Sequence, residues 1–161
     1  MKQLTILLIS SLLLAIANTA TAEEKPATQP ETASVGQQAD QLVGSKAKAD
    51  MTYQQLMEIM GDAYSMIQTG IVRQNQQMVK SGADIILNHP APNHQPWTIV
   101  EVKDQDAFKQ SLLDFDKILD EHAGASAAEA AKGNWPGANK AAFDLSSSCI
   151  ACHSMWKDKV K

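Results

Sequence analysis

Apolar residues recur at the helical spacing of three and four along most of this chain, and this periodicity limits the folds that it can adopt. The clearest stripe steps by four, three, four and three through Phe108, Leu112, Phe115, Leu119 and His122. Such a stripe places one face of a helix against a core. No segment shows the period-two alternation of a strand. The sequence therefore predicts an all-α fold.

The same period predicts four helices, which cover approximately these residues: 52–67, 71–88, 104–131 and 138–156. Thr52 and Gln55 have the spacing of a capping box at the start of the first helix. The second helix is expected to end before Pro90, because the residue preceding a proline is pushed out of the helical region. Four amphipathic helices predict an up-down-up-down four-helix bundle at residues 50–161.

The N-terminal part of the chain is expected to lie outside this bundle. Residues 1–22 combine Lys2, a short apolar run and the small residues Ala20 and Ala22, which is typical of a cleavable signal peptide and predicts export. Residues 23–49 are rich in Ala, Thr, Gln, Pro and Glu, with few large apolar side chains. Such a composition predicts a flexible or disordered leader.

Both cysteines of the chain stand in one short motif within the fourth expected helix. Cys149, Cys152 and His153 have the C-x-x-C-H spacing that attaches a c-type haem. Residues three and four apart lie on one face of a helix, so all three side chains would point the same way. The expected roles are two thioether bonds to the haem from the cysteines and proximal iron ligation by the histidine.

Other uses of the same residues remain open at this stage. A thioredoxin-like dithiol requires the cysteines at a helix N-terminus after a strand, and no strand pattern precedes Cys149. A zinc site requires further ligands at a recognisable spacing. A local disulfide between Cys149 and Cys152 suits an exported protein, although its small loop would remove little entropy from the unfolded chain.

Bundle topology also yields candidates for a second axial ligand of the iron. In an up-down-up-down bundle the start of the first helix lies level with the end of the fourth, which places Met57 opposite His153. A thioether is a known axial partner of histidine in cytochromes. Met60 lies on the same helix face. The histidines at 89 and 94 lie in the connection that crosses the same end of the bundle, so both are rival candidates.

These residues resemble the class II c-type cytochromes, a family that includes cytochrome c′ and its low-spin relatives of the cytochrome c-556 type. The resemblance covers roughly residues 51–157 and rests on these positions: Leu56, Met57, Gly61, Cys149, Cys152, His153, Trp156 and Lys157. In low-spin members a methionine early in the first helix binds the iron, and Met57 falls on that position. In high-spin members an apolar side chain usually takes its place and leaves the iron five-coordinate.

Two positions depart from the pattern of that family. Lys157 stands where arginine is usual. Tyr53 stands where high-spin members usually carry arginine, four residues before the distal position. The second departure favours the low-spin branch.

Taken together, the sequence predicts a periplasmic protein with one covalently bound haem c that acts in electron transfer between redox partner proteins. The alternatives are a five-coordinate, nitric-oxide-binding protein and a helical module without haem. The formal net charge is −4, and no basic stripe indicates nucleic acid. No catalytic constellation is evident, so an enzyme is not expected, and no membrane contact is expected after signal cleavage. Many members of the family dimerise, which leaves a homodimer open.

Overall fold

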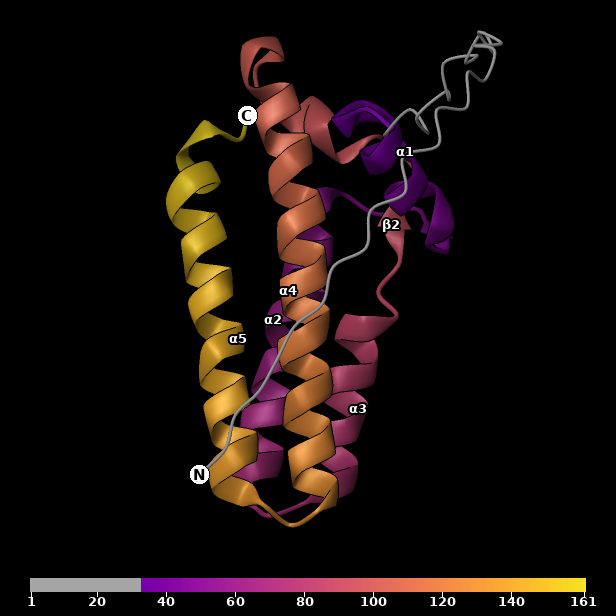
Figure 1. The fold of residues 1–161 in the computed structure, drawn as a ribbon. Helices are drawn as coiled ribbons and strands as arrows, with labels where there is room; N and C mark the ends of the chain where they lie inside the picture. Colours follow the sequence, from indigo (N-terminus) through magenta and orange to yellow (C-terminus); the bar gives the residue numbers. More distant parts are fainter. Residues whose placement is uncertain (1–32) are drawn as a thin grey trace, which may run out of the picture. The chain divides into compact units, whose positions relative to one another are not determined.

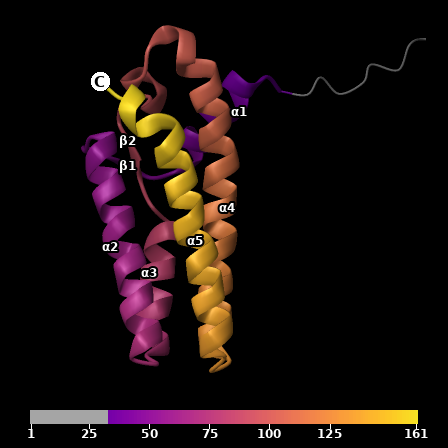
Figure 2. The ribbon, with the colours of Figure 1, turned by 90° about the vertical axis from the view of Figure 1, so that its left-hand side faces the viewer.

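Five α-helices account for most of residues 33–161, the part of the chain that the computed structural model describes. In chain order they are α1 Val35–Ser45, α2 Tyr53–Val72, α3 Gln76–Leu87, α4 Gln105–Ala131 and α5 Trp135–Trp156. The helices α2 to α5 lie side by side as a helical bundle (Figures 1 and 2). The prediction of a helical fold is confirmed for these residues.

The starts of the bundle helices follow from their capping residues. At the start of α2, Gln55 N donates to Thr52 Oγ1 at 3.1 Å, and Thr52 N donates to Gln55 Oε1 at 2.8 Å. This is the predicted capping box. At the start of α3, Met78 N donates to the side chain of Asn75 at 3.0 Å. Residues 71 and 72, expected to open the second helix, instead end α2, because Asn75 provides the cap that starts the next helix.

The fourth bundle helix begins earlier than the sequence indicated. Asn134 caps α5 by accepting from Gly137 N at 3.2 Å, and Pro136 occupies its first turn. A proline is tolerated there because the first helical N–H groups have no partner within the helix. Gly133, just before the cap, has φ of 73°, a conformation that favours glycine. The connection between α4 and α5 is therefore confined to residues 132–134.

Residues 35–49, expected to belong to a flexible leader, form α1 and a short strand. Ser34 and Gln37 form a second capping box at the start of α1. Ala39 is 1% exposed and packs into a cluster with Trp97 and Phe108. The strand β1 (Lys48–Ala49) pairs in parallel with β2 (Ala91–Pro92). The leader prediction is wrong for this segment, because a small side chain on an amphipathic helix fits closely against aromatic rings.

The compact unit that holds the bundle accordingly includes residues 33–49 rather than beginning at residue 50. The expected signal peptide at 1–22 and the first part of the expected leader, residues 23–32, lie outside the described residues.

Three short 3₁₀ helices complete the regular structure of this unit: Pro96–Ile99, Val102–Asp104 and Lys157–Lys159. The first two lie in the connection between α3 and α4. Trp97 and Val100 from this segment are buried. The segment packs with the last residues of the chain, since Lys161 N donates to Ile99 O at 3.0 Å.

The core of the bundle changes character along its length. Toward the α4–α5 connection it consists of mainly small side chains: Ala63, Ile67, Val79, Ala83, Ile86, Ala123, Ala130, Ala138, Ala142 and Leu145. Small residues allow helices to approach closely and leave little space between them. Toward the other end, aromatic residues from three segments form a separate cluster: Trp97, Phe108 and Trp156. The bundle is thus solid at one end, and the space for a site lies toward the other.

Gly82 of α3 is expected to be essential for this close packing. A Cβ atom at position 82 would lie 2.6 Å from Ala63 O and 2.8 Å from Ile67 Cγ1 of α2. Gly82→Ala should therefore lower the free energy of unfolding by about 1–3 kcal/mol, despite the better helix propensity of alanine. Urea denaturation measures this change.

Gly124→Ala in α4 is the matched control for Gly82→Ala, because a Cβ there meets no atom within 4 Å. It should raise the free energy of unfolding by up to about 1 kcal/mol. If both alanine variants were stabilised equally, the close approach of α2 and α3 would not restrict the size of the side chain at position 82.

Candidate cofactor site

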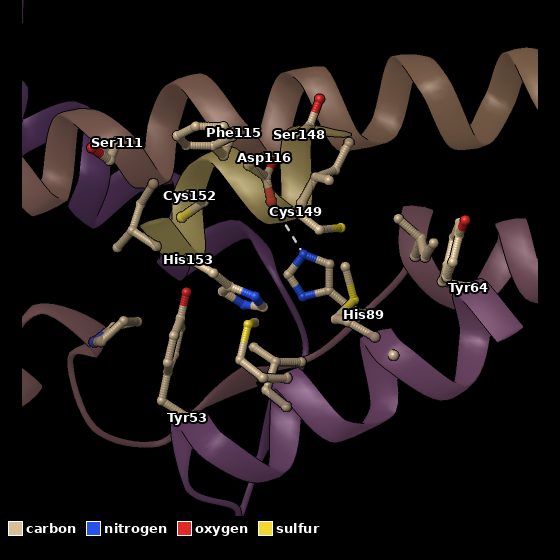
Figure 3. Close-up of a pocket in the computed structure, with 18 of the residues that line it drawn as sticks. Tyr53, Tyr64, His89, Ser111, Phe115, Asp116, Ser148, Cys149, Cys152 and His153 are labelled. Carbon is tan, nitrogen blue, oxygen red and sulfur yellow. Dashed lines mark hydrogen bonds and ion pairs between the residues drawn. The ribbon is translucent and has the colours of Figure 1, made fainter. Parts of the chain in front are cut away.

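A cavity of about 380 Å³ lies at the end of the bundle that the aromatic cluster occupies. Its walls come from the beginning of α2, the beginning of α4 and the end of α5, with further residues from α1 and from the α3–α4 connection. Apolar side chains dominate them: Leu42, Val43, Leu56, Ile86, Pro92, Leu112, Phe115, Leu119, Leu145 and Ile150. Figure 3 shows many of the lining residues, among them the two cysteines and two histidines. A volume of this size is within the range of small-molecule sites.

The predicted motif on α5 lines this cavity. Cys149, Cys152 and His153 all belong to the lining, as expected for side chains three and four residues apart on one helix face. The two cysteines are half-buried, whereas His153 is exposed at the edge of the cavity. In Figure 3 the His153 ring is directed into the space between α5 and α2. The structure therefore brings the two thiols and the imidazole to one opening.

Trp156 fixes the rotation of α5 about its own axis. Its ring is 7% exposed and meets Phe108 edge-on, with 5.0 Å between the ring centroids and 76° between the ring planes. Its Nε1 donates to Ser111 Oγ of α4 at 3.0 Å. Buried indoles of this kind combine a large apolar contact with a directional polar one. Because Trp156 is tied to α4, the cysteine face of α5 is turned toward the cavity.

Met57, the predicted second axial ligand, lies in the lining on the side of α2. It is partly buried, as is Met60 one turn further along the same helix. Met60 also packs against the alanine-rich core, whereas Met57 belongs to neither of the two buried clusters. By position, the sulfur atoms of Met57 and Met60 are both candidates for the second axial ligand. Met57 is the better candidate, because its side chain does not also pack against the core.

Tyr53, four residues before Met57, closes the cavity beside the aromatic cluster. Its ring meets Phe108 edge-on, with 6.1 Å between centroids and 71° between planes. Burial, followed by the nearby Cys152 and Asp116, raises the pKa of the Tyr53 hydroxyl. The phenol therefore stays uncharged at neutral pH.

The other histidines are distributed differently. His89 lines the cavity and its side chain is 13% exposed. His94 is exposed and does not belong to the lining. His122, the last residue of the α4 stripe, is partly buried but also lies outside the lining. Of the two rival histidines, only His89 is therefore close to the candidate site.

Three charged or titratable groups from separate segments meet on one wall of the cavity. Lys46 Nζ lies 2.9 Å from Asp116 Oδ1, and His89 Nε2 lies 3.1 Å from the same oxygen. We call these three residues the Lys46–Asp116–His89 cluster. Burial raises the pKa of Asp116, but the hydrogen bonds from His89 and Lys46 outweigh burial, so the pKa is below its usual value. Asp116 is therefore ionised at neutral pH.

The sequence interpretation missed Lys46 and Asp116. Lys46 lies in the segment that was expected to be a flexible leader. Asp116 follows Phe115 and lies one turn after Leu112 in the apolar stripe of α4, so it borders the face that lines the cavity. A charged residue at the edge of an apolar stripe was the sequence signal that could have identified Asp116 as a residue of the site.

The two half-buried thiols are kept in their protonated form. Burial raises the pKa of Cys149, and burial together with the neighbouring Cys149 raises that of Cys152. Redox-active thiols require the opposite change, a pKa lowered by a positive charge or a helix N-terminus. The two cysteines are not joined by a disulfide in the structure. The arrangement does not favour dithiol chemistry.

The side chains of the cavity fit a flat, largely apolar iron cofactor held through its periphery. Two thiols three residues apart can each form a thioether, imidazole is a common iron ligand, and a methionine on the facing helix offers a second axial group. Within residues 33–161, no group of three or more His, Cys, Asp and Glu side chains is placed to hold a metal ion.

Comparison of the chain with family models, with curated proteins and with solved structures finds no match. The case for a function therefore rests on the cavity and its side chains. Among the described helices, none has the length and apolar character needed to cross a bilayer.

Proposed function

We propose that the chain is a monohaem c-type cytochrome that transfers single electrons, with His153 and Met57 as axial ligands of a low-spin haem iron. The observation that carries this proposal is the common cavity of Cys149, Cys152 and His153 from α5 with Met57 from α2. Sequence spacing alone accounts for the first three residues. It does not account for a methionine that lines the same cavity from another helix.

A bound haem would supply the iron that gains and loses the electron. Cys149 and Cys152 would hold the group by thioether bonds, and His153 and Met57 would ligate its iron. Filling both axial positions leaves none open for substrate, which suits electron exchange better than catalysis. The apolar walls limit the access of water to the group, and a methionine ligand raises its reduction potential.

The proposal includes an up-down-up-down order of α2 to α5. The connections between α2 and α3 and between α4 and α5 comprise only residues 73–75 and 132–134. Connections as short as these favour antiparallel neighbours. This order places the start of α2 beside the end of α5, in agreement with their shared cavity.

The proposed location is the periplasm, reached by means of a cleavable signal peptide at residues 1–22. Other redox proteins are the proposed partners. One of the exposed residues of the cavity edge is Ile150, which is 65% exposed and lies between the two cysteines in the motif. Electrons would pass to a partner most directly at this edge, because it brings the site closest to the surface.

An absorption spectrum of the protein tests this function. The full chain is expressed with its N-terminal segment in a host that attaches c-type haem in its periplasm, and the ferric and ferrous spectra are recorded. We expect a low-spin spectrum. In the ferric state it should include the weak charge-transfer band, at the red end of the visible range, of methionine bound to iron. A variant with Cys149→Ser and Cys152→Ser should lose the haem on extraction with acidified acetone.

Two other spectra would contradict the proposal in different ways. A high-spin spectrum would indicate an open iron position, with Met57 only packing beside it, and would favour the gas-binding alternative. A correctly exported protein without a Soret band would favour a helical module without haem, with its cysteines available for a local disulfide.

A further inference from the structure

His89 is a potential iron ligand that is not one of the two proposed axial ligands, His153 and Met57. Its ring is directed into the cavity that also receives the His153 ring (Figure 3). Imidazole binds iron well, and it competes with thioether sulfur for the ferric state in particular. A histidine free to move in this cavity would therefore compete with Met57. Ligation by Met57 therefore requires that other contacts hold His89 away from the iron.

Both ring nitrogens of His89 face a hydrogen-bond acceptor. Nδ1 lies 3.0 Å from Pro90 O, and Nε2 lies 3.1 Å from Asp116 Oδ1. Both partners are hydrogen-bond acceptors, so a ring nitrogen bonds to either of them by donating its hydrogen. A nitrogen that carries a hydrogen has no free lone pair for a metal. With its hydrogen on Nε2, the ring is directed by the bond to Asp116, and that nitrogen offers no lone pair to a metal.

Asp116 itself is held by the second cation of the cluster. Lys46, whose side chain is 14% exposed, contacts the same carboxylate oxygen at 2.9 Å. Asp116 is 17% exposed and is carried by α4, a helix of 27 residues that also contributes Leu112, Phe115 and Leu119 to the cavity. Charge-assisted hydrogen bonds between partly buried groups are stronger than those between neutral groups. The carboxylate is therefore a firmly positioned acceptor.

We propose that Asp116 is a positioning residue that holds His89 away from the iron and so determines that Met57 is the sixth ligand. This inference rests on the proposed function and extends it to the choice of ligand. Removing the carboxylate frees His89, which then displaces Met57 and converts the His/Met iron into a bis-histidine iron. The iron stays low-spin in this exchange, so the change is specific to the ligand.

The test variant replaces Lys46 and Asp116 together, as Lys46→Leu with Asp116→Leu. Replacing both partners with apolar groups of similar size leaves neither charge buried alone, which favours folding. Lys46→Leu alone is the matched control, because it keeps the bond between Asp116 and His89. A third variant adds His89→Phe to the double replacement. Far-UV circular dichroism checks the fold of each.

The ferric absorption and electron paramagnetic resonance spectra report the ligands. In the double variant we expect the methionine-to-iron absorption to be lost, the iron to stay low-spin with the signal of two imidazoles, and the reduction potential to fall. Lys46→Leu alone should keep the methionine absorption. Adding His89→Phe should restore it, which a merely structural effect of position 116 would not produce.

Two results would overturn the inference. One is a folded double variant that keeps its methionine absorption, and the other is loss of that absorption that His89→Phe does not reverse. If the double variant does not fold, Asp116→Ala answers the same question, since it removes the oxygen that accepts from His89 altogether. A bis-histidine fraction above that of the unmodified protein then supports the role of Asp116, and its absence refutes it. The spectrum of the unmodified protein tests the proposed function separately.

Discussion

Replacing Met57 with leucine is expected to convert the proposed low-spin haem iron into a high-spin, five-coordinate one. Leucine is close to methionine in volume, so the cavity should change little in shape, while the thioether ligand is lost. His89 should remain bound to Asp116, so no second imidazole replaces the methionine. The reduction potential should fall, because methionine ligation raises it. Absorption spectra of the ferric and ferrous protein and a redox titration measure both effects.

Met60→Leu provides the control for Met57→Leu. Met60 lies on the same helix and lines the same cavity, but it also packs against the core. This variant should keep the low-spin spectrum and the methionine absorption. If Met57→Leu left the spectrum unchanged and Met60→Leu altered it, the sixth ligand would be Met60. If neither variant altered it, His89 would become the candidate for the sixth ligand.

The parts of the site that the sequence predicted are those determined by spacing within one helix. Cys149, Cys152 and His153 share a face of α5 because of the helical repeat alone, and the structure places all three in one cavity. Met57 needed a further assumption, that the start of one helix lies beside the end of another. Its place in the lining agrees with that assumption, and its role as a ligand stays a prediction.

Other parts depend on contacts between segments that are distant in the sequence. The Lys46–Asp116–His89 cluster joins residues separated by up to 70 positions, and no local pattern brings them together. The pairing of β1 with β2 is of the same kind, since each strand has only two residues. Such short strands have no periodicity of their own and form because the flanking segments are already held in place.

The missed helix α1 is instructive because a local signal for it existed. Ser34 and Gln37 have the same capping-box spacing as Thr52 and Gln55, which correctly marked the start of α2. The composition of residues 23–49 outweighed this signal, since large apolar residues are few. Composition measures what a segment can bury by itself. It does not measure how a small residue such as Ala39 fits against aromatic rings supplied by the rest of the chain.

Ala39→Glu is expected to separate α1 from the bundle and to open the cavity. Ala39 is 1% exposed and packs among Trp97, Phe108 and Trp156, where a carboxylate would have no partner. Because burying an unpaired charge is costly, α1 should detach rather than retain it there. The free energy of unfolding should fall by about 2–4 kcal/mol. Trypsin should then cleave after Lys46 and Lys48 much faster than in the unmodified protein.

Gln41→Glu introduces the same charge at an exposed position of the same helix, so it should change neither stability nor the rate of cleavage appreciably. The comparison separates loss of packing from an effect of charge. Detaching α1 also withdraws Leu42, Val43 and Lys46 from the cavity walls, so Asp116 loses one of its two partners. The haem of Ala39→Glu should therefore be more exposed to water and its reduction potential lower. A variant that is cleaved rapidly yet keeps the original potential would show that α1 covers the site without influencing it.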